Sequence, residues 1–289
     1  MSEIRESEKT YRRKRRRELL SQIVLGTAIT LIAFVVLYPL FFVISTSFKT
    51  YGEFIKSPFS VTFRHPENYV KAFVEGRLGR SIVNSVIVAA VAVTCQTMIT
   101  AFAIYGIGVL RFKGSGIFIG ILLFTMFISG EMTTVPNILL IRELGLYNTL
   151  GALIFPAALG VSGLGVFIGI NYVKAIPGEL HEAANLDGAS VPKMFFSIDL
   201  PMIKPVLAFV AINAFSGAWS DFFGPLVYIP MNEDAYTLAI TVQKFDTQNN
   251  SEYGTLCAGL VILAAPVVVI YSIFSKYFLE GVAIGAVKG

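Results

Sequence analysis

The chain has few charged side chains for its length. Asp, Glu, Lys and Arg make up only 15% of its 289 residues, whereas 55% of the residues are hydrophobic and 24 are Phe. The mean hydropathy is +0.69. Soluble domains carry roughly a quarter charged residues, so this composition excludes a soluble globular protein. The sequence therefore predicts a polytopic membrane protein.

Cysteine and histidine are scarce, and their positions exclude several kinds of site. The two cysteines, Cys95 and Cys257, both fall in apolar runs, where a thiol behaves as a small hydrophobic group and no disulfide framework is implied. The two histidines, His65 and His181, have no Cys or carboxylate at ligand spacing. We therefore interpret both as solvated loop side chains and expect no metal site and no catalytic constellation.

The sequence also lacks a G-x-x-x-x-G-K-[ST] phosphate-binding loop. Because such a loop is what binds the phosphates of ATP in many ATPases, any ATP that this protein uses must be hydrolysed by another chain. We therefore expect no enzyme activity and no cofactor in this chain.

Charged residues are spaced as membrane helices require. A charged side chain at the middle of a bilayer costs about 2.5 to 3.5 kcal/mol on insertion scales, which confines charge to the ends of spans. The charge-free intervals are Leu19–Phe48, Ser81–Leu110, Gly114–Gly130, Leu144–Val173, Pro205–Ser220 and Tyr253–Ser275.

The third and fifth intervals are short for a span of roughly 20 residues, but each continues past a single acid, Glu131 or Asp221, into more apolar sequence. Both are therefore predicted to be complete spans. The sequence thus predicts an all-α fold with six transmembrane helices, in which residues 19–289 form the membrane domain and residues 1–18 a basic cytoplasmic tail.

Lysine and arginine predict the orientation in the membrane. Eight precede the first span, including the run RRKRRR at Arg12 to Arg17, and two, three and two follow spans two, four and six. Together these are 15 of the 23 basic residues, all on one side. By the positive-inside rule this side is cytoplasmic. Both termini and the loop at about residues 174–204 are therefore expected in the cytoplasm.

The sequence of that loop predicts a helix-turn-helix between spans four and five. Pro177 suits a first helical turn, and a short helix is expected from Pro177 to Leu186. Gly188 can adopt the left-handed conformation that ends helices, and Ser190 can cap a second helix that stops at Pro201. Leu180, Ala183 and Ala184 share one face of the first helix at three- and four-residue spacing.

Two roles for this hairpin stay open from the residues alone. It can pack on the protein's own bundle, or it can dock to a cytoplasmic partner. Nucleic-acid binding is disfavoured, because the acids outnumber the bases and no basic face results. The charged side chains are Glu179, Glu182, Asp187 and Asp199 against Lys174, Lys193 and Lys204.

The hairpin resembles the EAA loop of ABC importer permeases. Glu182-Ala183-Ala184, then Gly188 after three residues, then Ile198-Asp199-Leu200-Pro201 match its pattern at each defined position. Further matches are NYV at 68–70, NS at 84–85, LGLYNTLGALIFP at 144–156 and the ending EGVAIGAVKG. The chain looks like the second permease of a sugar importer of the maltose and oligosaccharide type. One departure is Ser220, where the family more often has Asn.

The resemblance implies a set of partners in a bacterial or archaeal cell membrane. A second, homologous permease would complete the pathway, a cytoplasmic ABC ATPase dimer would bind ATP and Mg, and an extracytoplasmic binding protein would deliver a sugar or oligosaccharide. The ATPase-coupling residues it implies are Glu182, Ala183, Ala184, Asp187, Gly188 and Pro201.

A route for sugar is expected near the outer face. At about 1.5 Å per residue, Glu131 and Asp221 lie roughly 25 Å along their spans. Asp221 is next to Trp219 and Phe222, and an aromatic face beside a carboxylate can stack on a sugar ring and accept its hydroxyl protons. Asn213 lies deeper in the same span. The alternative for these residues is an interfacial aromatic belt with snorkelling acids.

Six spans would also suit a secondary transporter or channel. That class predicts ionisable residues at the bilayer midplane, and the charge-free intervals contain none. The ATP-driven importer is therefore the favoured function.

Overall fold

The computed structural model describes residues 2–110, 112–248 and 253–286, and within them the chain is helical and contains no strand. The longest helices are α1 (Ser2–Thr46), α4 (Leu78–Ile104) and α15 (Tyr253–Ala286). The others are α2 (Tyr51–Lys56), α3 (Glu67–Glu75), α5 (Ser115–Thr125), α6 (Thr134–Glu143), α7 (Gly151–Leu159), α8 (Gly163–Lys174), α9 (Glu179–Leu186), α10 (Val191–Met194), α11 (Leu200–Met202), α12 (Lys204–Ser220), α13 (Phe223–Tyr228) and α14 (Leu238–Gln248). Two π-helical segments, η1 (Tyr105–Leu110) and η3 (Phe195–Asp199), and two 3-10 turns, η2 (Gly130–Thr133) and η4 (Glu233–Ala235), complete the described chain.

The all-α membrane fold is confirmed, and its span count is four to six. Four helical stretches within the described residues are long and apolar enough to cross a bilayer: Leu19–Thr46, Leu78–Leu110, Gly151–Lys174 and Tyr253–Phe274. Two bent pairs of helices, Ser115–Thr125 with Gly130–Glu143 and Val191–Met202 with Lys204–Ser220, raise the number to six if each is one span.

Neither span three nor span five passes its acid as one straight helix. Around Glu131 the chain bends by 99° between the two helices of its pair. At the end of α12, Asp221 has an extended backbone (φ −69°, ψ 113°), and its carboxylate accepts the Gly224 N–H at 2.9 Å. This hydrogen bond helps to start α13, so the acid ends one helix and begins another.

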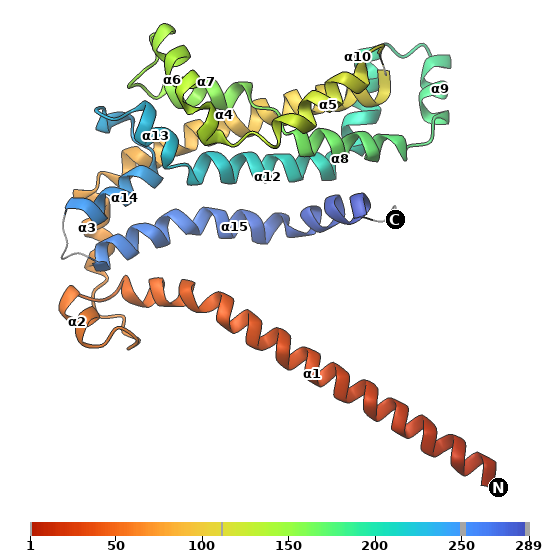
Figure 1. Ribbon diagram of the computed structural model, residues 1–289, viewed down its shortest axis with the longest axis horizontal. Helices are drawn as coiled ribbons and strands as arrows, with labels where there is room; N and C mark the ends of the chain where they lie inside the picture. Colours follow the sequence, from red (N-terminus) through yellow and green to blue (C-terminus); the bar gives the residue numbers. More distant parts are fainter. Residues whose placement is uncertain (1, 111, 249–252, 287–289) are drawn as a thin grey trace.

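The bundle is built around α4 and α12, which pack along each other beside α7, α8 and α15 (Figure 1). Two buried glycines let α8 approach both partners. A Cβ on Gly169 would meet the Ile104 side chain of α4, and one on Gly165 would meet Val210 of α12. Because lipid is as apolar as a leucine side chain, close packing of small residues is a main source of helix association in membranes.

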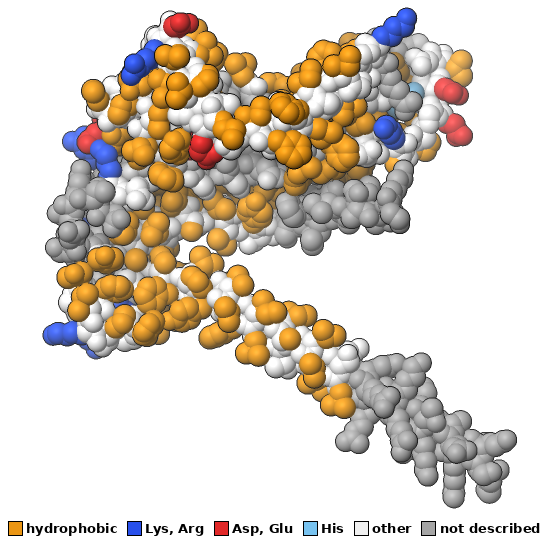
Figure 2. All heavy atoms as spheres, viewed as in Figure 1, with side chains coloured by type: hydrophobic (Ala, Val, Ile, Leu, Met, Phe, Trp, Pro, Cys, Tyr) orange, Lys and Arg blue, Asp and Glu red, His pale blue; other side chains and the backbone are white. Residues whose placement is uncertain are grey.

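Helix α1 contacts α15, but most of the length of α1 stands apart from the bundle (Figure 1). Between Leu19 and Phe41 its large apolar side chains are exposed, for example Phe34 at 72% and Val35 at 71%. Figure 2 shows hydrophobic side chains over this helix and the flank of the bundle, with charged side chains mainly at the two ends of the bundle. Such a surface fits lipid or another membrane helix.

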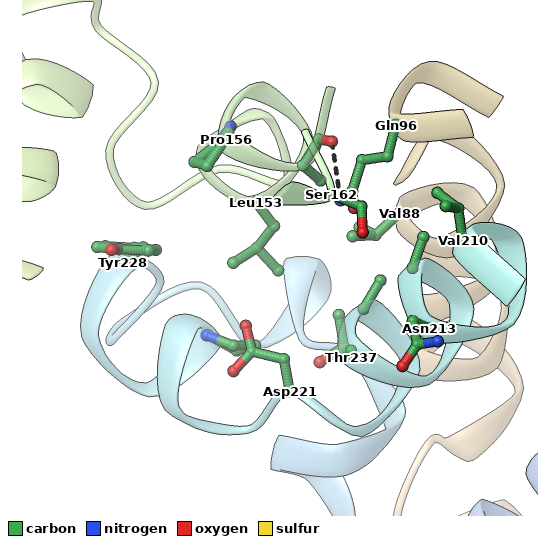
Figure 3. Close-up of a pocket in the computed structure, with 15 residues that line it drawn as sticks. Val88, Gln96, Leu153, Pro156, Ser162, Val210, Asn213, Asp221, Tyr228 and Thr237 are labelled. Carbon is green, nitrogen blue, oxygen red and sulfur yellow. Dashed lines mark hydrogen bonds between the residues drawn. The ribbon is translucent and has the colours of Figure 1, made fainter. Parts of the chain in front are cut away.

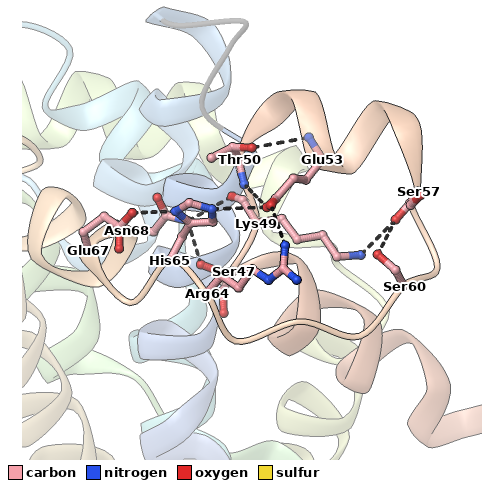
Figure 4. A network of polar contacts seen from close by, with 10 residues as sticks. All are labelled: Ser47, Lys49, Thr50, Glu53, Ser57, Ser60, Arg64, His65, Glu67 and Asn68. Atoms are coloured by element: carbon pink, nitrogen blue, oxygen red, sulfur yellow. Dashed lines mark hydrogen bonds and ion pairs between the residues drawn. The ribbon is translucent and has the colours of Figure 1, made fainter.

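A polar network orders the connection between α1 and α4 (Figure 4). Lys49 is 1% exposed, and its Nζ donates to the carbonyls of Pro58 at 2.7 Å and Ser57 at 3.3 Å. Burial lowers the pKa of this lysine. The Asn68 amide donates to the carbonyls of Ser47 and Lys49. These bonds fasten the end of α1 to the loop that follows it.

His65 belongs to the same network and is not the solvated side chain that we expected. Its Nδ1 lies 2.6 Å from Oε1 of Glu67, and its Nε2 lies 3.3 Å from Oε2 of Glu53. The hydrogen bond to Glu67 is the main cause that raises the pKa of His65. Glu67 is close to His65 in the sequence, whereas Glu53 is brought to the ring by the fold of the loop.

Candidate functional site

The hairpin between α8 and α12 forms one end of the molecule, with α9 standing clear of the bundle (Figure 1). Gly188 has φ +70°, which confirms the expected left-handed residue after α9. Its N–H donates to Asn185 O at 3.1 Å, and the Ala189 N–H donates to Ala184 O at 2.9 Å. These bonds close the end of α9 and turn the chain toward α10.

The second helix of the hairpin is longer and less regular than predicted. The Ser190 side chain makes no capping hydrogen bond, and the helix passes through Pro201 to Met202 before the bend at Ile203. Proline normally clashes with the carbonyl four residues earlier. Here the five residues before Leu200 form the π-helical segment η3, whose wider turn relieves this clash. The helix therefore ends one residue after the expected stop at Pro201.

The exposed face of α9 includes Leu180 and Ala183, two of the three residues of the face predicted from spacing. Glu182, Ala183 and Asp187 are exposed, whereas Ala184 is half-buried with His181. Leu186 at the tip of the helix is 90% exposed. Gly188 and Pro201 are also exposed, so Ala184 is the one implied coupling residue that is not fully accessible.

His181 makes a buried contact that the sequence did not predict. Its side chain is only 21% exposed, and its Nε2 lies 2.9 Å from Oδ1 of Asp199, which is 1% exposed. With Asp199 ionised, the ring nitrogen donates and the carboxylate accepts. The interpretation of His181 as a solvated loop side chain is thus wrong. An acid between Ile198 and Leu200 in the apolar run FFSIDLP was the available signal.

A pocket lies between α4, α7, α12 and α13 (Figure 3). Its volume is about 390 Å³, within the range of small-molecule sites. Polar side chains from several elements line it together with apolar ones such as Val88, Leu153 and Val210. The polar lining residues are Gln96, Ser162, Asn213, Asp221, Tyr228 and Thr237.

Two of the five predicted pathway residues, Asn213 and Asp221, line this pocket. Asp221 lies at one end of its floor, and Asn213 lies two turns back along α12, on the same side (Figure 3). The Asn213 side-chain N–H donates to Phe209 O at 2.8 Å, one helical turn earlier. Gln96 and Ser162 lie across the pocket and were missed, because neither stands near an acid or an aromatic residue in the sequence.

The other three predicted pathway residues lie elsewhere. Trp219 is 4% exposed, its ring stacks on Phe215 at 5.4 Å, and its Nε1–H donates to Leu263 O of α15 at 2.9 Å. It therefore packs the core, contrary to the expectation that its ring faces the route. Phe222 and Glu131 are exposed and are not among the residues that line the pocket.

The described part of the chain, which excludes residues 1, 111, 249–252 and 287–289, contains no group of three His, Cys, Asp or Glu side chains placed to hold a metal ion. The polar groups of the pocket are instead amide, hydroxyl and carboxylate groups, which exchange hydrogen bonds with the hydroxyl groups of a ligand.

The chain is similar to membrane transport proteins in sequence and in fold. The sequence profile of the family described as "Binding-protein-dependent transport system inner membrane component" matches residues 9–283. The chain is 34% identical over 253 residues to the probable ABC transporter permease protein YurM of Bacillus subtilis, covering 87% of this chain and 84% of that one. It is 31% identical to the arabinooligosaccharides transport system permease protein AraQ of Halalkalibacterium halodurans, covering 96% and 100%.

A further relative is the trehalose/maltose transport system permease protein MalG of Thermococcus litoralis, at 30% identity over 95% of this chain and 99% of that one. The fold is that of a chain in the crystal structure of a bacterial ABC transporter involved in the import of the acidic polysaccharide alginate, with a TM-score of 0.77, 22% identity, and coverage of 90% and 96%. From the profile match and these relatives, the chain belongs to the binding-protein-dependent transport system inner membrane component family.

Proposed function

We propose that this chain is the second permease of an ATP-driven sugar importer and that α9 couples it to a separate ATPase. The observation that carries the proposal is the protruding helix α9. It bears the Glu182-Ala183-Ala184 motif, exposes most of that motif to solvent, and ends in a left-handed glycine. A short helix held away from its own bundle is a surface for another chain. This observation favours docking over packing on the bundle, the two roles that the sequence left open.

Sugars are the substrate class that the relatives support. The relatives' names include arabinooligosaccharides and trehalose/maltose transport, and one further relative is a melibiose, raffinose and stachyose import permease. The pocket offers amide, hydroxyl and carboxylate groups against apolar walls, the mixture that suits a polyhydroxylated ring.

The proposed partners supply what this chain lacks and cover what it exposes. It has no phosphate-binding loop, so we place ATP and Mg on a cytoplasmic ATPase dimer. The uncovered apolar side chains of α1 fit a second permease that packs beside this one in the membrane. An extracytoplasmic binding protein would deliver the sugar to the opposite end of the bundle from α9.

We place both termini and α9 in the cytoplasm of a bacterial or archaeal cell, because 15 of the 23 basic residues fall on their side. In the structure α1 begins, and α15 ends, toward the end of the bundle where α9 lies (Figure 1). Retention of a cytoplasmic ATPase by α9, and its loss in variants of that helix, checks this orientation as well.

Energy coupling is the direct test of this function. The chain reconstituted in vesicles with a second permease, the ATPase and a binding protein should take up a labelled sugar from a panel of maltose, trehalose and arabinooligosaccharides only when ATP is supplied. Purified alone, it should hydrolyse no ATP. Uptake driven by an ion gradient without ATP would instead assign the chain to the secondary transporters.

The pocket predicts a specific effect of Asn213 on substrate affinity. We expect Asn213→Ala to raise the KM for the transported sugar by roughly two- to tenfold, the worth of one neutral hydrogen bond. Asp221→Asn keeps an acceptor for the Gly224 N–H but removes the charge, so it should raise KM at least as much. The measurement is the concentration dependence of ATP-driven uptake.

Asn171 supplies a matched control for this test. Its amide also donates to the carbonyl four residues earlier, Phe167 O at 3.1 Å, but it lies on an exposed face of α8. Asn171→Ala should therefore leave KM unchanged. Equal KM values for the Asn213 and Asn171 variants would remove the pocket from the sugar route.

A further inference from the structure

The hairpin contains a second polar feature besides its exposed motif. None of the other described helices packs extensively on α9. What joins the middle of α9 to the bundle is the contact between His181 Nε2 and Asp199 Oδ1, at 2.9 Å. These two residues are 18 positions apart, on the two arms of the hairpin.

The acceptor in this contact is a buried carboxylate. Asp199 is 1% exposed, and its second oxygen, Oδ2, has no hydrogen-bond partner among the described residues. A buried carboxylate that is left without a donor is strongly unfavourable. Because His181 supplies a side-chain donor to this carboxylate, the carboxylate holds the histidine, and with it α9, close to the second arm.

The second arm is itself anchored to the membrane helices. Phe195 of η3 is buried, and its ring lies 5.1 Å from Phe102 of α4 and 5.0 Å from Tyr105 of η1. Tyr105 also donates its hydroxyl to Val191 O at 3.3 Å. After η3, the Ile203 N–H donates to Asp199 O at 3.0 Å, directly before α12 begins.

Both sides of this anchor are π-helical. The two π segments, η1 and η3, contact each other through Tyr105 and Phe195. Single π turns inside α-helices are found frequently at functional sites. The aromatic contacts thus join η3 to α4 and η1, and the chain joins it to α12.

We propose that His181 and Asp199 are positioning residues that transmit the displacement of α9 to the membrane helices α4 and α12. Among the described residues, the pair is the side-chain hydrogen bond that joins α9 to the second arm; without it, α9 can move with the ATPase while η3 stays in place. The exposed residues of α9 make contact with the ATPase, whereas the His181–Asp199 pair carries the movement inward. This inference rests on the proposed docking of an ATPase to α9.

The test separates transmission from docking. In the reconstituted complex, His181→Ala should still retain the ATPase on purification, but the amount of sugar taken up per ATP hydrolysed should fall by at least about fivefold, the lower end of typical coupling between sites. ATP hydrolysis without the loaded binding protein should rise. The probe is the sugar from the maltose, trehalose and arabinooligosaccharide panel that the unaltered complex takes up.

Conservative variants separate transmission from mere stability. His181→Gln keeps a donor and should recover most of the uptake per ATP, whereas Asp199→Asn, which keeps the volume but loses the charge, should lower it. If the pair only stabilised the fold, its variants would lower the amount of assembled complex but leave the sugar taken up per ATP unchanged. That result would overturn the proposal. Because uptake is measured per ATP hydrolysed, the test holds even when His181→Ala assembles poorly. Ser190→Ala, in the same hairpin and without a capping hydrogen bond, is the control.

Comparison with Gly188→Val distinguishes docking from transmission. If Gly188→Val releases the ATPase while His181→Ala leaves uptake per ATP unchanged, docking stands and transmission through this pair is refuted. If neither variant changes retention or uptake, the proposed docking of α9 fails, and transmission through the pair fails with it.

Discussion

Gly188→Val is expected to lower ATP-driven sugar uptake by about tenfold while leaving the membrane bundle folded. Gly188 has φ +70°, and a side chain other than glycine pays roughly 1 to 2 kcal/mol in that conformation, with a β-branched residue at the upper end. If the loop relieves this strain by leaving the geometry that docks, affinity for the ATPase falls by about tenfold for each 1.4 kcal/mol. The measurement is retention of the ATPase on the purified complex, together with ATP-driven uptake.

The surroundings of Gly188 make this experiment interpretable. A Cβ at this position would meet no atom within 4 Å, so the effect within this chain is conformational strain and not a clash. Gly188→Asn should therefore retain the ATPase, because asparagine visits the left-handed region more readily than other residues, and Gly188→Ala should fall between the two. The same loss in the Asn and Val variants would mean that contact surface, and not backbone conformation, is what the ATPase requires.

Charge at the start of α9 gives an independent check on the same surface. Glu179 and Glu182 both lie in the first turn of α9, where acids favour the helix dipole equally. Glu182→Lys should weaken ATPase retention more than Glu179→Lys if Glu182 faces a basic group of the ATPase. Equal effects would attribute the loss to the helix dipole alone.

Trp219→Ala is expected to destabilise the folded chain severely, and so to lower its yield and thermal stability rather than its affinity for sugar. The ring fills the core between α12 and α15, stacks on Phe215 and donates to Leu263 O. Removing a buried tryptophan from a core typically costs about 3 to 5 kcal/mol, because the surrounding side chains do not close the cavity. The measurement is the unfolding temperature of the purified chain in detergent.

Trp219→Phe should recover part of this stability, since it keeps the stacked ring and loses only the hydrogen bond. Phe222→Ala is the matched control, because that aromatic side chain is 46% exposed and its removal should leave the unfolding temperature nearly unchanged. If Trp219→Ala unfolds at the same temperature as the unaltered chain but takes up no sugar, the tryptophan has a role in the pathway that its buried position does not suggest.

The amino-acid sequence alone determined the membrane class, the helical fold and the identity of the hairpin. These features depend on local chemistry. The cost of charge in hydrocarbon fixes where spans can lie, and a left-handed residue after α9 requires a glycine-like side chain at position 188 whatever the neighbours are. The motif around Glu182 is likewise contiguous in the chain, so the order of its residues is enough to identify it.

What only the tertiary structure decided is which side chains meet across the bundle. Trp219 and Asp221 are two residues apart in the sequence, yet one packs against α15 and the other lines the pocket, because α12 ends between them at Ser220. Asp199 and His181 lie 18 residues apart and are joined only because the hairpin closes at Gly188. Apolar composition places a residue in the membrane without fixing its direction around the helix, since both the lipid and the protein interior accept an apolar side chain. That direction was therefore settled by packing.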